Sequence, residues 1–256
     1  MLRHVRAFRA ALAFFTRLPV GRADVWSEHG LDGALAWLPA VGLLVGSLGG
    51  AALWLAAQAV PPLAAAVLTC LVLALLTGAL HLDGVADCGD GLLSALPRER
   101  RLQVMREPQV GAFGVLALFF VLTLKIAALE ALAHASPPLA SCVGAVALAT
   151  VLGRCAVFFG VLLPSARPDG MGSRSVRGTR PLHGLAALVL TLGLCLGNGW
   201  LGGGWAASVA ACVAAAAATC AVLGCAWRQL GGVTGDVYGC LIEVTECSAL
   251  IAAAVW

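Results

Sequence analysis

Charged residues are scarce in this 256-residue sequence: 11% are Asp, Glu, Lys or Arg, and 61% are hydrophobic. A soluble globular domain carries about 25% charged residues. Apolar stretches of roughly 20 residues, long enough to cross a hydrocarbon layer of about 30 Å, recur along the chain. The short alternating segments of a membrane β-barrel are missing. The shortage of charge therefore argues against a soluble domain and predicts an all-α polytopic membrane bundle, a single integral membrane domain over residues 1–256.

Three other patterns are absent. The ten cysteines include no pair with the spacing of a zinc ribbon or a thioredoxin motif, so we interpret them as small apolar packing residues. No repeat of solenoid length is visible. The first twenty residues lack a signal-peptide cleavage site, and Arg3, Arg6 and Arg9 alternate with apolar side chains. This pattern predicts an interfacial amphipathic helix over residues 1–20.

The apolar stretches predict about seven transmembrane helices, at residues 33–58, 62–82, 112–133, 139–163, 182–198, 204–224 and 238–256. The linkers near 59–61, 134–138 and 199–203 contain no Lys or Arg, whereas the alternate linkers hold most of the arginines. By the positive-inside rule, we expect the basic loops (83–110, 165–181 and 226–237) in the cytoplasm. The N-terminus is then inside and the C-terminus outside.

The stretch "HLDGVADCGDG", residues 81–91, places three aspartates directly behind an uncharged run. Asp83, Asp87 and Asp90 are spaced i, i+4 and i+7, which puts them on one face of a helix. Like charges on one face repel each other, and a divalent cation would neutralise them. Hard carboxylate oxygens suit Mg²⁺ or Mn²⁺. The alternative is a solvated acidic helix end.

A second acidic stretch, "GGVTGDVYGCLIEVTE", covers residues 231–246. Asp236, Glu243 and Glu246 again share one helical face, at the start of the last apolar run. Ionisable groups inside a membrane span indicate a functional site by default. The glycines ahead of Asp236 would let backbone N–H groups approach a phosphate. The alternative is a charged helix cap with unrelated glutamates.

Several arginines are placed where they could hold an anion. Arg106 lies in "MREPQVGAFG" (residues 105–114), in which Gly111 and Gly114 flank the start of the next span. Its guanidinium could grip a phosphate with two parallel hydrogen bonds, or it could be an ordinary positive-inside arginine. Arg167, in the loop at 163–172, could clamp an anionic ligand.

Three more charged residues lie inside predicted spans. Arg154, in the fourth span, either extends toward the cytoplasmic side or binds phosphate. Lys125 and Glu130, in the third span, either satisfy each other or reach the outer interface.

Clustered carboxylates, arginines and glycine turns on the cytoplasmic side favour an enzyme that moves a phosphate-linked group at the membrane. An aspartate-rich prenyltransferase is a second hypothesis, but only Asp83–Asp87 fits one of its two acidic motifs. A transporter with an intramembrane charge path is a third. Its inverted repeats are not visible, and the charges gather at one side instead.

Six blocks occur in an order that resembles the cobalamin synthase (adenosylcobinamide-GDP ribazoletransferase) family. They are "FFTRLPV" (14–20), "WLPAVGLLVG" (37–46), "HLDGVADCGDGL" (81–92), "MREPQVGAFG" (105–114), "RPDGMG" (167–172) and "GGVTGDVYGCLIEVTE" (231–246). Together they span nearly the whole chain. The pairing of His-x-Asp-Gly-x-x-Asp-x-x-Asp-Gly with Gly-Gly-x-Thr-Gly-Asp is specific.

The resemblance implies a Mg²⁺-dependent, multi-pass enzyme of the bacterial inner membrane with its active site facing the cytoplasm. Such an enzyme joins adenosylcobinamide-GDP to α-ribazole or its 5′-phosphate and releases GMP. Its partners are these substrates and the lipid bilayer; no nucleic acid is expected, and homo-oligomerisation is left open.

Residue by residue, the resemblance implies three groups of site residues. The catalytic candidates are Asp83, Asp87 and Asp90. The metal ligands are the same three with Asp236 and Glu243. The substrate-binding candidates are His81, Arg106, Gly111, Gly114, Arg154, Arg167, Gly232, Thr234 and Gly235.

The chain departs from the family pattern at Glu107, Pro108 and Gln109, where the family usually has Asp-Ser-Arg. Gln109 therefore lacks a cation that could hold phosphate, and Glu107 is only a weak ligand candidate.

Overall fold

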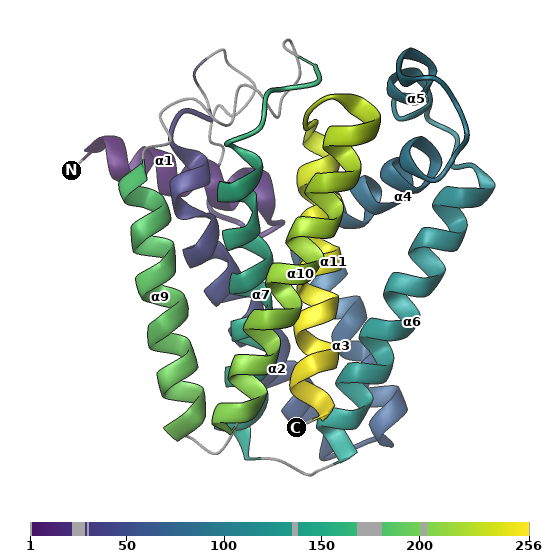
Figure 1. The fold of residues 1–256 in the computed structure, drawn as a ribbon. Coiled ribbons are helices and arrows are strands. Elements are labelled where there is room, and N and C mark those ends of the chain that lie inside the picture. Colours follow the sequence, from purple (N-terminus) through teal and green to yellow (C-terminus); the bar gives the residue numbers. More distant parts are fainter. Residues whose placement is uncertain are drawn as a thin grey trace.

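The computed structural model describes residues 2–21, 29, 31–134, 138–167, 181–200 and 204–255 (Figure 1). Apart from one bridge between Ser165 and Val233, no β-structure occurs in these ranges. The described helices are α1 (Leu2–Phe15), η1 (Ala34–Trp37), α2 (Leu38–Ala57), α3 (Pro62–Thr77), α4 (Leu80–Leu92), α5 (Arg98–Val104), α6 (Ala112–His134), α7 (Leu139–Gly160), α9 (Pro181–Trp200), α10 (Trp205–Leu230) and α11 (Gly235–Val255).

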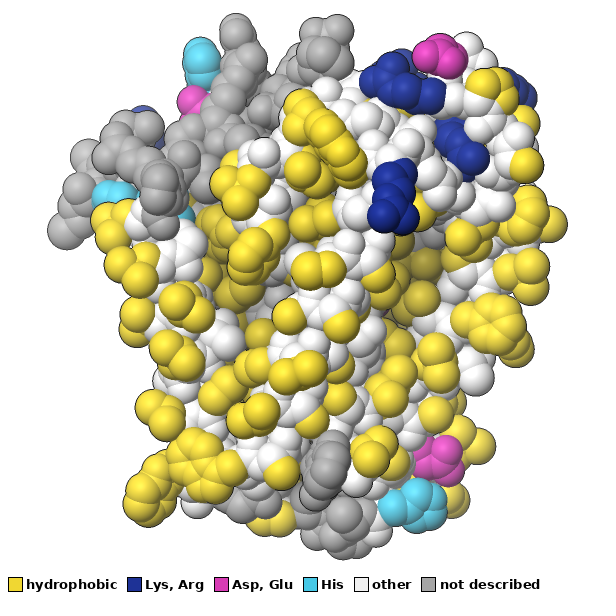
Figure 2. All heavy atoms as spheres, viewed as in Figure 1, with side chains coloured by type: hydrophobic (Ala, Val, Ile, Leu, Met, Phe, Trp, Pro, Cys, Tyr) yellow, Lys and Arg dark blue, Asp and Glu magenta, His cyan; other side chains and the backbone are white. Residues whose placement is uncertain are grey.

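Six described helices are long and apolar enough to cross a membrane, or seven if the bent pair α3–α4 counts as one span. Apolar side chains cover most of the body of the bundle, and Lys and Arg side chains gather near the end that carries α5 (Figure 2). The prediction of a polytopic helical bundle is therefore confirmed. The two most buried spans are α7 and α11, whereas α9 is mostly exposed to the surroundings.

The predicted span at 62–82 is wrong in one respect: α3 ends at Thr77, and α4 starts at Leu80 with a bend of 95°. Gly78 and Ala79 both have positive φ, 62° and 57°. The Gly78 N–H donates to Leu75 O and the Ala79 N–H to Ala74 O, the pattern of a Schellman cap. Glycine favours this end because it adopts positive φ without steric cost.

The bend makes the predicted loop at 83–110 largely helical, since it contains most of α4 and all of α5. The last two spans also extend further than predicted. The helix α10 continues to Leu230, and α11 begins at Gly235, so only four residues separate them. The predicted loop at 165–181 lies mostly outside the described residues.

The predicted amphipathic segment forms α1, which lies across the same end of the bundle as α4 and α5 (Figure 1). Its apolar residues Ala11, Leu12 and Phe15 are buried. The C-terminus lies at the opposite end from the N-terminus (Figure 1), which agrees with an odd number of crossings.

Candidate active site

The acidic helix α4 packs directly on the start of α11. Gly84 makes this approach possible, because a Cβ added there would lie 2.6 Å from Asp236 O and 3.0 Å from the Cα of Gly239. Contact at this distance excludes any larger side chain. The two acidic stretches that the sequence separates by about 150 positions therefore meet at one end of the bundle.

The carboxylates at this contact differ in exposure. Asp83 is exposed, Asp87 is half-buried, and Asp236 is partly buried at the start of α11. The helix α4 is not one of the six spanning helices. Burial raises the pKa of Asp87 to about 7, and the negative charges of Asp236 and Asp83 add to the effect. The site thus concentrates negative charge that a bound cation would offset.

Asp90, the third predicted aspartate, is buried and points at the start of α6. It accepts hydrogen bonds from the backbone N–H of Gly111 at 2.6 Å and of Gly114 at 2.8 Å. A carboxylate at a helix N-terminus satisfies unpaired N–H groups and matches the helix dipole. The structure therefore uses Asp90, Gly111 and Gly114 to join α4 to α6; their contact with a substrate stays a prediction.

Arg167 joins three segments around the acidic site. Its Nη1 donates to Asp236 Oδ2 at 2.8 Å, and its Nη2 donates to Leu102 O at 2.7 Å. Two backbone hydrogen bonds of 2.9 Å hold the segment that carries Arg167 against the turn before α11. They run from Ala166 N–H to Val233 O and from Val233 N–H to Pro164 O. The prediction that Arg167 lies at the site agrees with this geometry.

The glycine turn before α11 contacts protein in the described structure. A Cβ at Gly232 would lie 2.2 Å from Pro164 O, so only glycine fits there. Thr234 caps α11 by accepting the N–H of Val237 at 3.3 Å and donates to Asp236 at 3.2 Å. This packing accounts for Gly232 and Thr234 without a phosphate. Gly235 is exposed beside Asp236, and a phosphate contact for all three residues stays a prediction.

Three arginines near α5 differ in what they contact. Arg98 donates to Leu230 O at 2.7 Å, and Arg101 donates to Gly91 O at 2.7 Å and to Leu92 O at 3.0 Å. These two bind the carboxyl ends of α10 and α4. Arg106, in contrast, is exposed and makes no ion pair with a described residue, so it is available to a ligand.

Glu243 and Arg154 were predicted for the site but lie instead in a buried ion-pair cluster with Lys125 and Glu246. Lys125 donates to Glu243 Oε2 at 2.5 Å and to Glu246 Oε1 at 2.9 Å. Arg154 donates to Glu246 Oε2 and, at 3.2 Å, to Thr150 O. This arrangement corrects two interpretations: Lys125 does not pair with Glu130, and Arg154, 2% exposed, does not extend toward the cytoplasmic side.

The cluster links α6, α7 and α11 inside the bundle. With Glu243 bound to Lys125, its carboxylate faces that lysine, and its metal-ligand role is unsupported by this geometry. Sequence reasoning missed the pairing. The signal that could have found it is the balance of charge inside the predicted spans, where two cations need two anions.

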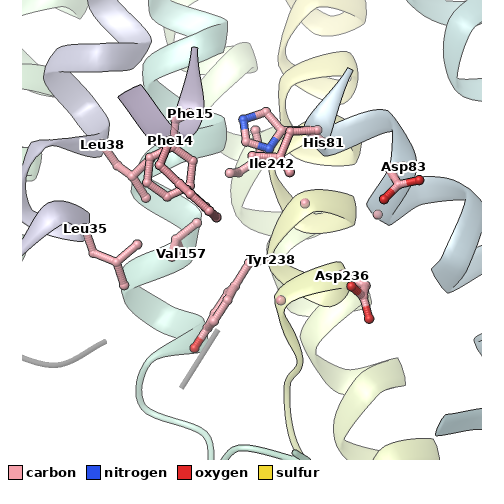
Figure 3. Close-up of a pocket in the computed structure, with 14 residues that line it drawn as sticks. Phe14, Phe15, Leu35, Leu38, His81, Asp83, Val157, Asp236, Tyr238 and Ile242 are labelled. Carbon is pink, nitrogen blue, oxygen red and sulfur yellow. The ribbon is translucent and has the colours of Figure 1, made fainter. Parts of the chain in front are cut away.

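A cavity of about 190 Å³ opens beside the carboxylates and was not predicted (Figure 3). Asp83 and Asp236 lie on one side of it, and Leu35 and Leu38 on the other (Figure 3). His81, predicted to bind substrate, lines the cavity together with Phe14, Phe15 and Tyr238. The signal in the sequence that could have indicated this cavity is the pair Phe14 and Phe15, two large apolar residues at the end of an amphipathic helix.

Two observations bear on whether the acidic site could hold a metal ion. Within the described ranges, no group of three or more His, Cys, Asp or Glu side chains is arranged to hold a metal ion. Mg²⁺ does not require such a cage, since it commonly binds one or two carboxylates together with substrate phosphates. Asp83, Asp87 and Asp236 are hard oxygen donors, and burial, with a smaller contribution from the charges of Asp236 and Asp83, raises the pKa of Asp87. These residues therefore fit a cation that arrives with a phosphate-bearing substrate.

The fold and the site together define an integral membrane protein with carboxylates and arginines gathered at one end of a helical bundle. A family model described as "Cobalamin-5-phosphate synthase" matches residues 7–254. The chain belongs to this family.

Curated relatives agree with that membership. A protein of Roseiflexus sp. (strain RS-1) is 38% identical over 94% of this chain and 86% of its own length. A second, of Bradyrhizobium diazoefficiens, is 37% identical over 96% of this chain and 92% of its own. A third, of Citrobacter koseri, is 38% identical over 96% of this chain and 98% of its own. All three are named adenosylcobinamide-GDP ribazoletransferase. No solved structure matches the chain.

Proposed function

We propose that this protein transfers the phosphocobinamide group of adenosylcobinamide-GDP to the ribose hydroxyl of α-ribazole or α-ribazole 5′-phosphate. The products are GMP and adenosylcobalamin or its 5′-phosphate. The observation that carries the proposal is the contact of α4 with α11, which brings Asp83 and Asp87 beside Asp236 and Arg167. The names of the full-length relatives supply the substrates.

In the proposed reaction, the ribose hydroxyl oxygen attacks the phosphorus attached to cobinamide. A new P–O bond forms, the P–O bond to the GMP phosphate breaks, and the bridging oxygen leaves with GMP. The hydroxyl proton passes to a site carboxylate acting as general base. Arg106, which is exposed, and Arg167, which lies beside Asp236, would hold phosphate oxygens.

The proposed cofactor is Mg²⁺, which one or two of the carboxylates of Asp83, Asp87 and Asp236 would hold together with phosphate oxygens of the substrate. When bound, it would neutralise charge on the diphosphate and on the leaving phosphate. Asp90 is committed to the N–H groups of α6, so we assign it the positioning of α4 against α6 rather than metal binding.

Two further proposals concern the setting. We place the protein in a bacterial inner membrane with the site on the cytoplasmic side, because the arginines gather near the end that carries α5 (Figure 2). The transporter alternative loses its main support, since Glu243 pairs with Lys125, and Arg154 pairs with Glu246, inside the bundle.

The test uses the full chain, purified into lipid nanodiscs with adenosylcobinamide-GDP, α-ribazole and Mg²⁺, and follows GMP release. GMP should appear only when donor, acceptor and Mg²⁺ are all present, and EDTA should abolish it. Folded protein that releases no GMP would contradict the proposal.

Three variants, Asp83→Asn, Asp87→Asn and Asp236→Asn, then separate the roles. If a substitution raises the Mg²⁺ concentration needed for half-maximal rate, the replaced residue is a metal ligand. If a substitution abolishes turnover but leaves the Mg²⁺ dependence unchanged, the replaced residue is the general base. A full rate at unchanged Mg²⁺ dependence in all three would remove the acidic cluster from the mechanism.

A further inference from the structure

The cavity beside the carboxylates has the volume and the largely apolar lining to hold an apolar ring system. Its walls come from the end of α1, from η1, from the starts of α2, α4 and α11, and from the end of α7. Phe15, Leu38, Val157 and Ile242 form much of its surface (Figure 3). An apolar cavity of about 150 Å³ can hold benzene. A volume of about 190 Å³ is therefore large enough for an aromatic ring system that reaches toward the opening.

One buried polar group in this wall has no partner. His81 is 2% exposed, and its Nε2 forms no hydrogen bond within the described structure. The imidazole ring lies 6.2 Å from the ring of Phe15, at an angle of 31°. A buried polar atom without a partner costs free energy that a bound ligand can recover. A ligand with a polar ring atom on this side of the cavity would bring a hydrogen-bonding group close to the His81 imidazole.

We propose that this cavity binds the aromatic base of the acceptor nucleoside and directs its ribose toward Asp83 and Asp236. The inference rests on the proposed function and identifies which substrate occupies this part of the site. The base of α-ribazole carries two methyl groups and one ring nitrogen free of the sugar. Phe15 and Val157 contact the rings, and the free nitrogen turns toward the imidazole of His81.

The donor's guanine fits this cavity less well. Guanine has several donors and acceptors along its edges, each of which needs a partner when buried. Besides Asp83 and Asp236 at one side, His81 and the Tyr238 hydroxyl are the only polar side-chain groups among the described residues of the cavity wall. A methylated base with a single free nitrogen buries fewer polar groups in this wall than guanine does.

The first experiment measures binding of α-ribazole, without donor, to the full chain in nanodiscs by titration calorimetry. Val157→Phe would fill the cavity, since Val157 is 1% exposed in its wall. We expect binding weakened by about tenfold or more, the size of effect that a misfitting group produces in an apolar pocket. The matched control is Val209→Phe on α10, where the side chain is 62% exposed, and it should bind as wild type does.

Steady-state kinetics give a second readout. Val157→Phe should raise KM for α-ribazole by about tenfold and leave KM for adenosylcobinamide-GDP unchanged. The opposite change, Val157→Ala, should improve binding of a riboside whose base carries a third fused ring, relative to wild type. His81→Gln keeps a donor and should bind more tightly than His81→Leu.

The outcomes separate this inference from the proposed function. If wild type releases GMP but Val157→Phe binds α-ribazole as wild type does, the cavity assignment is overturned and the function stands. A rise in KM for the donor instead would assign the cavity to guanine and also overturn it. If Val157→Phe does not fold, equal binding of the bulkier riboside by wild type and Val157→Ala overturns it. Absence of GMP release by wild type, with α-ribazole still bound in the cavity, would overturn only the proposed function.

Discussion

The substitution Glu246→Gln tests the buried ion-pair cluster. Glu246 accepts Lys125 with one carboxylate oxygen and Arg154 with the other, and all three side chains are 2–3% exposed. Glu243 supplies the second negative charge through Lys125. The four charges sum to zero. Replacing Glu246 by Gln leaves a net charge of +1 in a place that water does not reach.

The expected cost follows from that burial. Breaking a buried pair by removing one partner destabilises a protein by about 3–5 kcal/mol. The remaining described hydrogen bond of Arg154 is to Thr150 O at 3.2 Å, a weaker partner than a carboxylate. For a chain of this size, each kcal/mol lowers Tm by roughly 2–4 °C. We therefore expect Glu246→Gln to lower Tm by roughly 6–20 °C.

The assay is thermal unfolding of wild type and variants in identical nanodiscs. The matched control is Glu130→Gln on α6, whose partner His134 is 3.6 Å away and 64% exposed. This exposed pair should contribute less than about 1 kcal/mol. The double variant Arg154→Met/Glu246→Leu removes one charge of each sign. It should be less destabilised than Glu246→Gln, because no uncompensated charge remains.

The reasoning fails if Glu246→Gln unfolds within the error of Glu130→Gln. It also fails if the double variant is at least as unstable as Glu246→Gln. Either result would mean that water reaches the cluster in the membrane-embedded protein, or that Lys125 and Arg154 find other partners.

Three other predictions follow from the site. Gly84→Ala should push α4 away from α11, because its Cβ would lie 2.6 Å from Asp236 O, and the rate of GMP release should fall by about tenfold or more. The control Gly224→Ala, at a position with open space around it, should retain the wild-type rate. Asp90→Ala should lower stability by about 1–3 kcal/mol in thermal unfolding, since two N–H groups of α6 lose their acceptor, while the Mg²⁺ concentration for half-maximal rate stays unchanged. Gly78→Ala should cost roughly 1 kcal/mol in the same assay because φ is 62°, and a higher Tm would contradict the assigned cap.

The sequence by itself determined the class of fold and the main landmarks of the site. Apolar runs and the placement of arginines sufficed for a helical bundle with about seven spans. The physical reason is that a bilayer imposes a fixed length and forbids unpaired backbone groups, so hydropathy is nearly decisive. The spacing of Asp83, Asp87 and Asp90 likewise predicted one helical face, because that relation is local.

Only the tertiary structure decided what each charged residue does. Spacing could not show that Asp90 caps α6 or that Glu243 faces Lys125, since these partners lie 21 and 118 positions away in the chain. The bend at Gly78 turned a predicted straight span into two helices and moved the aspartates against α11. The cavity between α1 and α11 also depends on contacts between distant segments. Local patterns fix periodicity, but pairing of buried charges and the shape of a cavity arise only when helices pack.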